Sequence, residues 1–387
     1  MNAVNYLVGT EATVNRPMQP FCGEACGFLA DVSRLLMARG RDYPDVLSFA
    51  YFCRRANLRR MQEGRTGLEN RLGRGLAFHI TPGNIPVNFA FSFAFGLLAG
   101  NANIVRVPPK PFPQTDLICG AVRDALKDYP ALKERTAFVD YPVDNDITAG
   151  FSARADVRVL WGGDRTIGLI KGIPAKPRCI DVAFADRYSL AILSGEAILR
   201  LDEKGLGRLA EQYYNDTYLM DQNACSSPQL VLWTEDSPAA RERFWGAVYR
   251  LAREKYTLQP ELAVEKYTRA CENAIDLPEV SITSMGGLLI RAELPRLTED
   301  VQFLRGRGGY FYEYSLKNLE ELLPVVTDRY QTLCYFGVEP EKLRRFVIDG
   351  CMRGIDRIVP VGSAMDIGAV WDGYDLITAM SRTVALQ

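Results

Sequence analysis

Histidine is almost absent from this chain of 387 residues: the only one is His79. A zinc site with two or three histidine ligands is therefore excluded, and a hydrolase that needs a histidine base would have to use His79 itself. Because His79 is the next-to-last residue of an expected strand, a structural role is the commoner interpretation and a catalytic role the alternative. Covalent chemistry in this chain is expected to work without a histidine base.

Closely spaced cysteines are also lacking. None of the nine cysteines belongs to a CxxC pair, and Cys22 with Cys26 is a weak metal signal. Residues 1–20 contain no basic segment followed by an apolar run, so no secretory signal is expected. These features predict reduced thiols in a cytoplasmic protein that binds no metal.

Long hydrophobic runs and an excess of one charge are missing as well. The most apolar segment, residues 85–99, is short for a bilayer span and is interrupted by Asn88, Ser92 and Gly96, so it is better interpreted as a buried helix. The formal net charge of -1 gives no bulk attraction to a polyanion. No membrane insertion and no nucleic-acid partner are therefore expected.

What the chain does contain is an alternation of short apolar runs with helical patterns. Strands are expected at residues 75–80, 103–107, 136–140, 156–161 and 189–193. Strands that alternate with helices predict an α/β fold, with a parallel sheet covered by helices on both faces. Ligands of such sheets bind at the carboxyl ends of the strands.

The alternation of strands and helices becomes less regular near residues 210–220. Beyond that point we expect strands at 229–233 and 357–360 and helices at about 238–256 and 260–273. A domain boundary is therefore expected near residue 215.

Two loops at the expected carboxyl edge carry groups that could act on a ligand. In the loop at residues 81–86, the Asn84 amide could donate a hydrogen bond to an oxyanion, or it could simply cap the following helix. Gly162 and Gly163 separate a strand from a helix and would let a phosphate approach the backbone, although any strand-to-helix turn can use glycine.

Cys225 differs from the other cysteines in its setting. It is followed by Ser-Ser-Pro and a strand, so it lies on a connection rather than on the apolar stripe of a helix. Exposed loop cysteines are more often reactive, and the alternative is a small buried hydrophobic residue. Cys53, Cys119 and Cys334, by contrast, lie within apolar or helical patterns.

The stretch DQNACSSP at residues 221–228 and the tail RIVPVG at 357–362, with WDGYDL at 371–376, form a fairly specific combination. Together with the loop at 81–86 and the stretch LAGNANIVR at 98–106, they resemble the aldehyde dehydrogenase superfamily. Within it, the sequence is most similar to the LuxC-like long-chain fatty acyl-CoA reductase family. The likeness covers roughly residues 70–385.

This resemblance implies an aldehyde dehydrogenase-like α/β fold, with two Rossmann-like parallel-sheet domains and an active site in the cleft between them. Residues 1–215 would bind a nicotinamide cofactor, residues 216–362 would carry the catalytic cysteine, and residues 363–387 would pack back on the cofactor domain. Cys225 would attack the acyl carbon. Asn84 and the backbone N–H of Cys225 would hold the oxyanion.

The cofactor residues that the resemblance implies lie in the first domain. Gly162 and Gly163 fall near the pyrophosphate of the dinucleotide, and Thr81 and Pro82 belong to the neighbouring loop. Arg106 stands where many relatives have a lysine near the adenosine ribose. Its guanidinium could meet a 2′-phosphate, which favours NADPH and leaves NADH as the alternative.

One departure from the superfamily bears on the reaction. Hydrolytic members carry a glutamate that activates water, but the corresponding residues 181–190 contain no Glu and no Gly-Gly. A thioester substrate needs no such base, so the departure favours reduction of an acyl thioester. Asp181 or Asp186 could still act as a base.

The expected function is therefore NADPH-dependent reduction of an acyl-CoA or acyl-carrier thioester to the aldehyde in fatty acid metabolism, through an acyl-cysteine. The alternatives are a hydrolytic NAD-dependent aldehyde dehydrogenase and a non-redox subunit that accepts acyl groups. The family also implies an acyl-activating partner subunit and a homo-oligomer. The acyl pocket is left open, because Phe89, Phe93, Tyr213 and Tyr214 could line it or fill the core.

Overall fold

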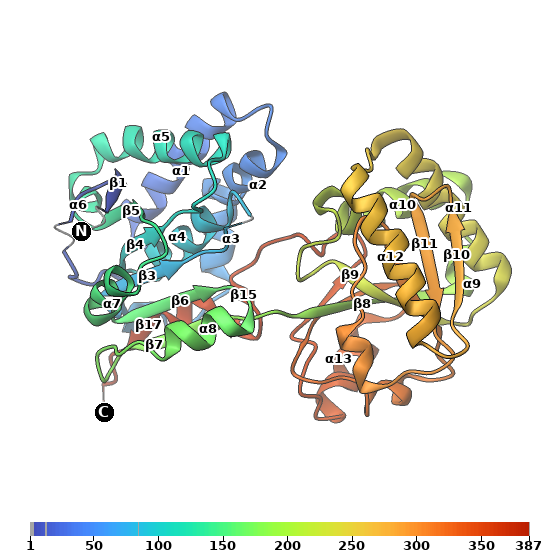
Figure 1. The fold of residues 1–387 in the computed structure, drawn as a ribbon. Helices are drawn as coiled ribbons and strands as arrows, with labels where there is room; N and C mark the ends of the chain where they lie inside the picture. Colours follow the sequence, from blue (N-terminus) through green and yellow to red (C-terminus); the bar gives the residue numbers. More distant parts are fainter. Residues whose placement is uncertain (1–3, 12–13, 84, 387) are drawn as a thin grey trace. The chain divides into compact units, whose positions relative to one another are not determined.

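The computed structural model describes residues 4–11, 14–83 and 85–386. It divides the chain into two compact units (Figure 1): unit 1 consists of Met1–Ala185 and Ile367–Gln387, and unit 2 of Asp186–Asp366. The division falls at residue 185, before the expected boundary near residue 215. The reason is that the strand at Tyr188–Ser194 pairs on both sides within the second sheet.

Unit 1 is built on a six-stranded sheet with the order β1-β5-β4-β3-β6-β7. Its strands are β1 (Asn5–Val8), β3 (Leu76–Ile80), β4 (Ala102–Arg106), β5 (Thr136–Asp140), β6 (Val157–Trp161) and β7 (Ile180–Phe184). All neighbours are parallel except β1 and β5. The chain runs from β3 outward to β5 and then returns to β6 on the other side of β3, so the strand order reverses between β3 and β6.

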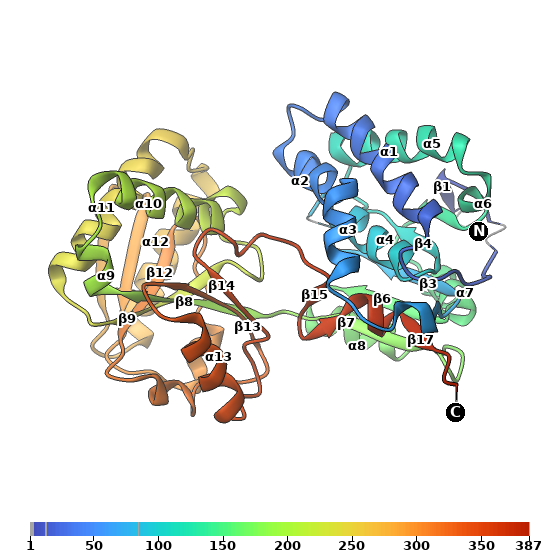
Figure 2. The same cartoon turned by 180° about the vertical axis from the view of Figure 1, so that it is seen from behind.

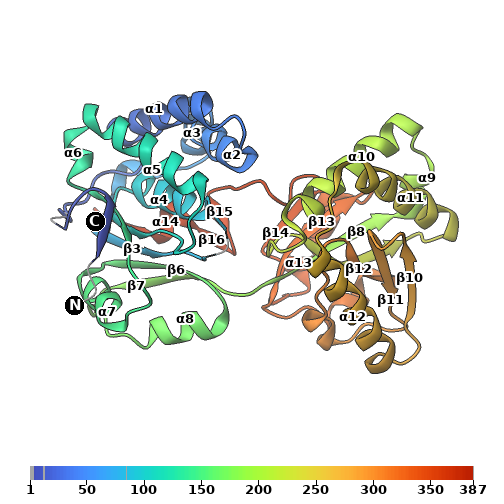
Figure 3. The same cartoon turned by 45° about the horizontal axis from the view of Figure 1, so that its top comes forward.

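Helices cover both faces of this sheet, as the alternation predicted (Figure 3). One face carries α1 (Gly23–Arg39), α2 (Pro44–Phe52), α3 (Arg55–Glu63), α4 (Asn88–Leu98) and α5 (Pro113–Ala125), with the short α6 (Pro130–Lys133) after them. The other face carries α7 (Asn145–Arg154) and α8 (Asp164–Lys171). Helix α4 is the expected apolar helix, and it is buried from Phe89 onward because it lies within the core.

The last residues of the chain belong to unit 1. Strand β17 (Ser381–Thr383) pairs antiparallel with β2 (Arg71–Gly73), and α14 (Leu376–Ala379) and the pair β15 (Val370–Trp371) and β16 (Tyr374–Asp375) precede it. Arg71 donates hydrogen bonds to Ser381 Oγ (2.8 Å) and to the Thr378 carbonyl (2.8 Å). These bonds attach the C-terminal segment to β2, with which β17 forms a separate two-stranded sheet.

Unit 2 is built on a seven-stranded sheet with the order β10-β11-β12-β9-β8-β13-β14. Its strands are β8 (Tyr188–Ser194), β9 (Pro228–Thr234), β10 (Ser281–Met285), β11 (Leu289–Glu293), β12 (Tyr310–Ser315), β13 (Tyr330–Phe336) and β14 (Arg357–Pro360). All neighbours are parallel except β10 and β11.

The second sheet also has a core on each face. Leu190 and Ile192 belong to one core, and Ala191 and Leu193 to the other, because successive side chains of a strand point to opposite faces. Helices α9 (Gly195–Leu199), α10 (Glu203–Thr217) and α11 (Pro238–Lys255) pack on the face toward the viewer in Figure 2, while α12 (Pro260–Asp276), in front in Figure 1, and α13 (Pro340–Asp349) pack on the other. Among the described residues, no helix is both long and apolar enough to cross a membrane.

Candidate active site

Cys225 lies on the connection between α10 and β9, as the sequence predicted. It is exposed, together with Cys271 and Cys351, whereas Cys53 and Cys334 are buried in hydrophobic cores. We refer to residues 221–227 as the Cys225 turn. The thiol is therefore accessible to a substrate from solvent.

The Cys225 turn begins with two residues in the left-handed backbone region. Asp221 has φ 49° and Gln222 has φ 61°, values that side-chain-bearing residues adopt only where their surroundings impose them. Tyr256 donates a hydrogen bond from its hydroxyl to Asp221 Oδ1 (2.6 Å). The Gly308 N–H donates to the Asp221 carbonyl (3.0 Å). Both contacts restrain the start of the turn.

The side-chain amide of Gln222 joins this turn to strand β12. It is buried, and its nitrogen donates to the carbonyls of Pro228 (3.1 Å) and Tyr310 (2.9 Å). Its oxygen accepts the N–H groups of Gly309 and Tyr310 (both 3.2 Å). A buried amide with all of these partners has one defined orientation, so the backbone that follows it is rigidly placed.

The backbone of Cys225 itself is anchored to the centre of the sheet. Its carbonyl accepts a hydrogen bond from Ser189 Oγ (2.6 Å) at the start of β8, and Ser189 Oγ accepts the Thr332 N–H (3.2 Å) from β13. Ser227 Oγ donates to the Asp216 carbonyl at the end of α10 (2.8 Å). The thiol is thus carried by a backbone fixed at both ends.

The carboxylate of Asp216 connects this region with the tail motif at 357–362. It is buried and accepts the N–H groups of Gly362 (2.6 Å) and Ala364 (2.9 Å). Burial raises the pKa of Asp216 to about 7, although both hydrogen bonds oppose this shift. Asp216 and Ser189 were not predicted from the sequence. A sign of Asp216 was available, because its carboxylate stands on the face of α10 that is otherwise made of buried residues.

In unit 1, the predicted cofactor residues gather at one edge of the sheet. Ile80, the last residue of β3, is aligned with Arg106 on β4 and with Leu160 on β6. Thr81 and Gly162 therefore leave neighbouring strands on either side of the point where the strand order reverses. Thr81 Oγ1 donates to the Arg106 carbonyl (2.7 Å). Sheets of this kind bind their ligands at this edge.

The geometry at this edge suits an anion. Gly163 precedes α8, and apart from its chain neighbours no heavy atom of the described residues lies within 4 Å of the position that a Cβ would take there. The Arg106 guanidinium stacks 4.5 Å from the Tyr141 ring centre and donates to the Tyr141 carbonyl (3.1 Å). Its Nε is buried without a partner among the described residues. Asn84, predicted to hold the oxyanion, lies outside the described residues.

His79 occupies a structural position. It is buried on β3, and its two ring nitrogens lie 2.8 Å from Ser92 Oγ and 3.0 Å from Asn103 Oδ1. Burial lowers the pKa of His79 to about 4. A neutral, fully buried imidazole supports the structural interpretation of this residue.

The two aspartates considered as bases are both held by arginines. Asp181 on β7 accepts two hydrogen bonds from Arg158, at 2.7 and 2.8 Å. Asp186 forms ion pairs with Arg305 (3.2 Å) and Arg329 (3.6 Å). A carboxylate whose oxygens point at a guanidinium is poorly placed to take a proton from water. Neither residue is therefore favoured as a general base.

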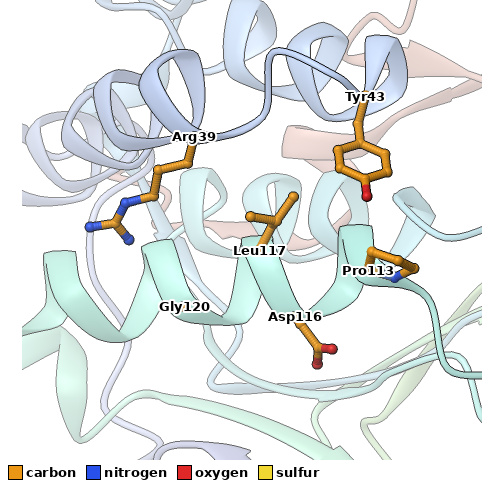
Figure 4. Close-up of a pocket in the computed structure, with 6 residues that line it drawn as sticks. All are labelled: Arg39, Tyr43, Pro113, Asp116, Leu117 and Gly120. Carbon is orange, nitrogen blue, oxygen red and sulfur yellow. The ribbon is translucent and has the colours of Figure 1, made fainter.

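The four aromatic residues considered for an acyl pocket are core residues. Phe89 and Phe93 pack against Phe138, and Tyr213 and Tyr214 lie in the core between α10 and the second sheet. A hollow of about 440 Å³ in unit 1 is shown in Figure 4. Its lining residues are Arg39, Tyr43, Pro113, Asp116, Leu117 and Gly120. They include none of the predicted site residues that the structure describes.

The fold is that of the aldehyde dehydrogenases. The chain superimposes on a mutant of the 1-pyrroline-5-carboxylate dehydrogenase from Thermus thermophilus with a TM-score of 0.63 at 14% identity, covering 94% of this chain and 81% of that one. For an NAD-dependent benzaldehyde dehydrogenase from Corynebacterium glutamicum, the TM-score is 0.62 at 11% identity, covering 93% and 84%. At these identities the likeness concerns the fold alone.

The family follows from the sequence match. The model of the acyl-CoA reductase (LuxC) family matches residues 39–270, and the chain belongs to this family, which confirms the resemblance. A long-chain acyl-protein thioester reductase of Photorhabdus luminescens is 23% identical over 311 residues, 78% of this chain and 61% of that protein. The protein of the same description from Aliivibrio fischeri is 26% identical over 168 residues, 42% and 33%. The chain thus spans less than two thirds of these relatives.

Proposed function

We propose that this protein reduces an acyl thioester to the aldehyde with NADPH as the reductant, through an acyl group carried on Cys225. The observation that carries the proposal is an exposed thiol on a turn whose backbone is fixed by the buried Gln222 amide and by Ser189. Membership of the acyl-CoA reductase family and an aldehyde dehydrogenase fold support the same chemistry.

The residues at the carboxyl edge of the first sheet fit a nicotinamide dinucleotide. The turn at Gly162 and Gly163, open at Gly163 and lying before α8, can receive a pyrophosphate, with Thr81 and Pro82 beside it. Arg106 offers a buried Nε that lacks a partner among the described residues, and its fork suits a 2′-phosphate. This favours NADPH over NADH. When bound, the cofactor supplies the hydride that reduces the acyl carbon.

The chain's own groups perform the acyl transfer. The Cys225 thiolate attacks the acyl carbon, a new carbon–sulfur bond forms, and the thiol of coenzyme A or of a carrier leaves with the electrons of the broken bond. The backbone N–H of Cys225 and the Asn84 amide are proposed to stabilise the oxyanion. After reduction, the thiohemiacetal on Cys225 collapses to the aldehyde and regenerates the thiolate.

The state of the two carboxylates at 181 and 186 favours release as the aldehyde. Among the described residues of the 181–190 stretch, the two carboxylates are engaged by Arg158, Arg305 and Arg329. Hydrolysis of the acyl-cysteine would therefore be slow. We propose an acyl-CoA or acyl-carrier thioester as the substrate, and expect an acyl-activating partner subunit and a homo-oligomer from the family.

The test is oxidation of NADPH and NADH against a series of acyl-CoAs of increasing chain length. Cys225→Ala is expected to lose turnover completely, because it removes the thiol that is proposed to carry the acyl group. Cys271→Ala, which removes another exposed thiol on α12, serves as the matched control and should turn over like the parent. Unchanged turnover in Cys225→Ala would contradict the proposal.

Product analysis separates the two alternatives. Free acid formed from aldehyde and NAD without coenzyme A would identify a hydrolytic aldehyde dehydrogenase. Acylation of Cys225 without oxidation of either nucleotide would identify a non-redox acyl-accepting subunit.

A further inference from the structure

Lys266 on α12 is a buried lysine whose three donors all meet backbone carbonyls. Its side chain is 2% exposed. The Nζ atom donates to the carbonyls of Gly308 (2.6 Å), Gly287 (2.8 Å) and Leu288 (3.0 Å). Lysine is rarely buried without a carboxylate partner, so this arrangement calls for a specific role.

One of these carbonyls belongs to the segment that supports the Cys225 turn. Gly308 and the following Gly309 have φ values of 58° and 87°, and a Cβ at Gly308 would lie 2.5 Å from Leu262 Cδ2. The Gly308 N–H donates to the Asp221 carbonyl, and the Gly309 N–H donates to Gln222 Oε1. The ammonium therefore fixes the glycine pair that in turn holds Asp221 and Gln222.

The other two carbonyls, of Gly287 and Leu288, belong to a segment that also contacts the residues before the Cys225 turn. Leu288 lies in the connection from β10 to β11, and its carbonyl also accepts the Tyr218 hydroxyl (3.1 Å). Tyr218 stands directly before the Cys225 turn, in the short helix at Tyr218–Met220. Lys266 thus joins three segments that are far apart in sequence.

We propose that the Lys266 ammonium is a positioning residue for the Cys225 turn, setting the backbone on which the thiol and its N–H meet the acyl group. This inference rests on the proposed function of Cys225. The alternative is a lysine that only stabilises the β10–β11 hairpin, which predicts lower stability without a separate loss of acyl transfer.

The protonation state of Lys266 matters because of its acceptors. A neutral amine has two N–H groups and would leave one carbonyl unpaired. Burial lowers the pKa of Lys266 to about 7, while the three carbonyls favour the charged form.

The charged and titratable side chains that line a small hollow together with Lys266 come from its own helix and from residues 305–310. They are Glu265, Arg269, Arg305, Arg307 and Tyr310. Arg307 also donates to Asn223 Oδ1 (2.7 Å), within the Cys225 turn.

The test compares two reactions of the same thiol in the full chain. Acylation is followed as release of coenzyme A from an acyl-CoA without nucleotide, and alkylation as labelling of Cys225 by iodoacetamide, located by peptide mass. In Lys266→Met, acylation is expected to fall about 100-fold, because small misplacement of reacting groups has effects of this size. Alkylation should stay close to the parent rate, since the thiol remains exposed.

Lys255→Met is the matched control, because Lys255 is an exposed lysine on the adjacent α11, paired with Glu211. It should match the parent in both reactions. Equal acylation in the parent and in Lys266→Met would overturn the inference and leave the proposed function intact. A parent chain that is alkylated but never acylated would overturn both.

If Lys266→Met does not fold, the inference is tested by the pH dependence of the two reactions in the parent chain. The ratio of the acylation rate to the alkylation rate cancels the ionisation of Cys225 and should fall as the pH rises through about 7, where Lys266 loses its proton. A constant ratio overturns the inference. Because Asp216 also titrates near neutrality, the profile is repeated in Asp216→Asn, where persistence of the fall assigns it to Lys266 and its disappearance overturns the inference.

Discussion

At the scale of single residues, Gln222 links the Cys225 turn to the neighbouring strand of the sheet. Its amide satisfies the N–H groups of Gly309 and Tyr310 and the carbonyls of Pro228 and Tyr310. Removing one partner from a buried network leaves the remaining groups without hydrogen bonds, which costs more than the net value of each bond.

We therefore expect Gln222→Met to lower the free energy of unfolding by about 3 kcal/mol and to slow acylation of Cys225. Methionine has a similar length but offers neither donor nor strong acceptor. Urea unfolding and release of coenzyme A measure the two effects. Gln212→Met, at an exposed position of α10, is the control and should change neither. A Gln222→Met protein as stable as the parent would show that the network is not needed.

The sequence could predict the exposed position of Cys225 on a connection but not the residues that support it. The pattern Cys-Ser-Ser-Pro before a strand already indicates an exposed connection. Gln222, in contrast, depends on partners almost ninety positions away, and no local pattern brings them together. The unusual burial of Lys266 could have been noticed in the sequence. It stands on the same helical face as Leu262 and Asn273, where an apolar residue is expected.

At the scale of elements, several strands with strong apolar signals were predicted well, whereas β7, β11, β12 and β13 were not predicted. The strand expected at 136–140 coincides with β5, and that at 229–233 lies within β9. Strand β10 was missed, because its sequence SITSM is polar and lies at the edge of the sheet. The strand expected at 357–360 coincides with β14, whereas the contact of Gly362 with Asp216 could not be predicted from the sequence.

The free energy of unfolding should depend on pH through Asp216, which links α10 to the tail motif at 357–362. Its pKa is raised from 3.8 to about 7 in the folded chain, so folding favours the protonated form. The contribution of Asp216 to stability is thus fully present below about pH 4 and is lost as the pH rises to about 7, by on the order of 4 kcal/mol. Urea unfolding at both pH values measures this slope.

The slope should be smaller in Asp216→Asn, which cannot ionise at this position. Asp276→Asn, at an exposed position of α12, should retain the slope of the parent. Identical slopes in the parent and in Asp216→Asn would rule out titration of this carboxyl in the folded chain.

At the scale of the whole molecule, the two units differ in how the chain forms them. Unit 2 is one continuous segment, Asp186–Asp366, with a core on each face of its sheet. Unit 1 needs both ends of the chain, because β17 pairs with β2 and the Asn101 side chain donates to the Met380 carbonyl (2.9 Å). The return of the tail to unit 1 was implied only by the family resemblance. The pattern of strands and helices does not predict it, because this pattern changes only beyond β8.

We expect residues 186–366, expressed alone, to fold into a unit that unfolds cooperatively in urea. The hydrogen bonds of Gln222, Ser189 and Lys266 that hold the Cys225 turn lie inside this segment, so iodoacetamide should label Cys225 at a rate close to that of the full chain. Residues 1–185 alone should be much less stable, because Arg71 and Asn101 lose their partners in the last segment. Circular dichroism during urea unfolding measures both fragments.

A 186–366 fragment that stays unfolded would mean that the Cys225 turn is supported from outside its own unit. A 1–185 fragment as stable as unit 1 in the full chain would mean that the C-terminal strand, which pairs with β2, adds little to the stability of this unit.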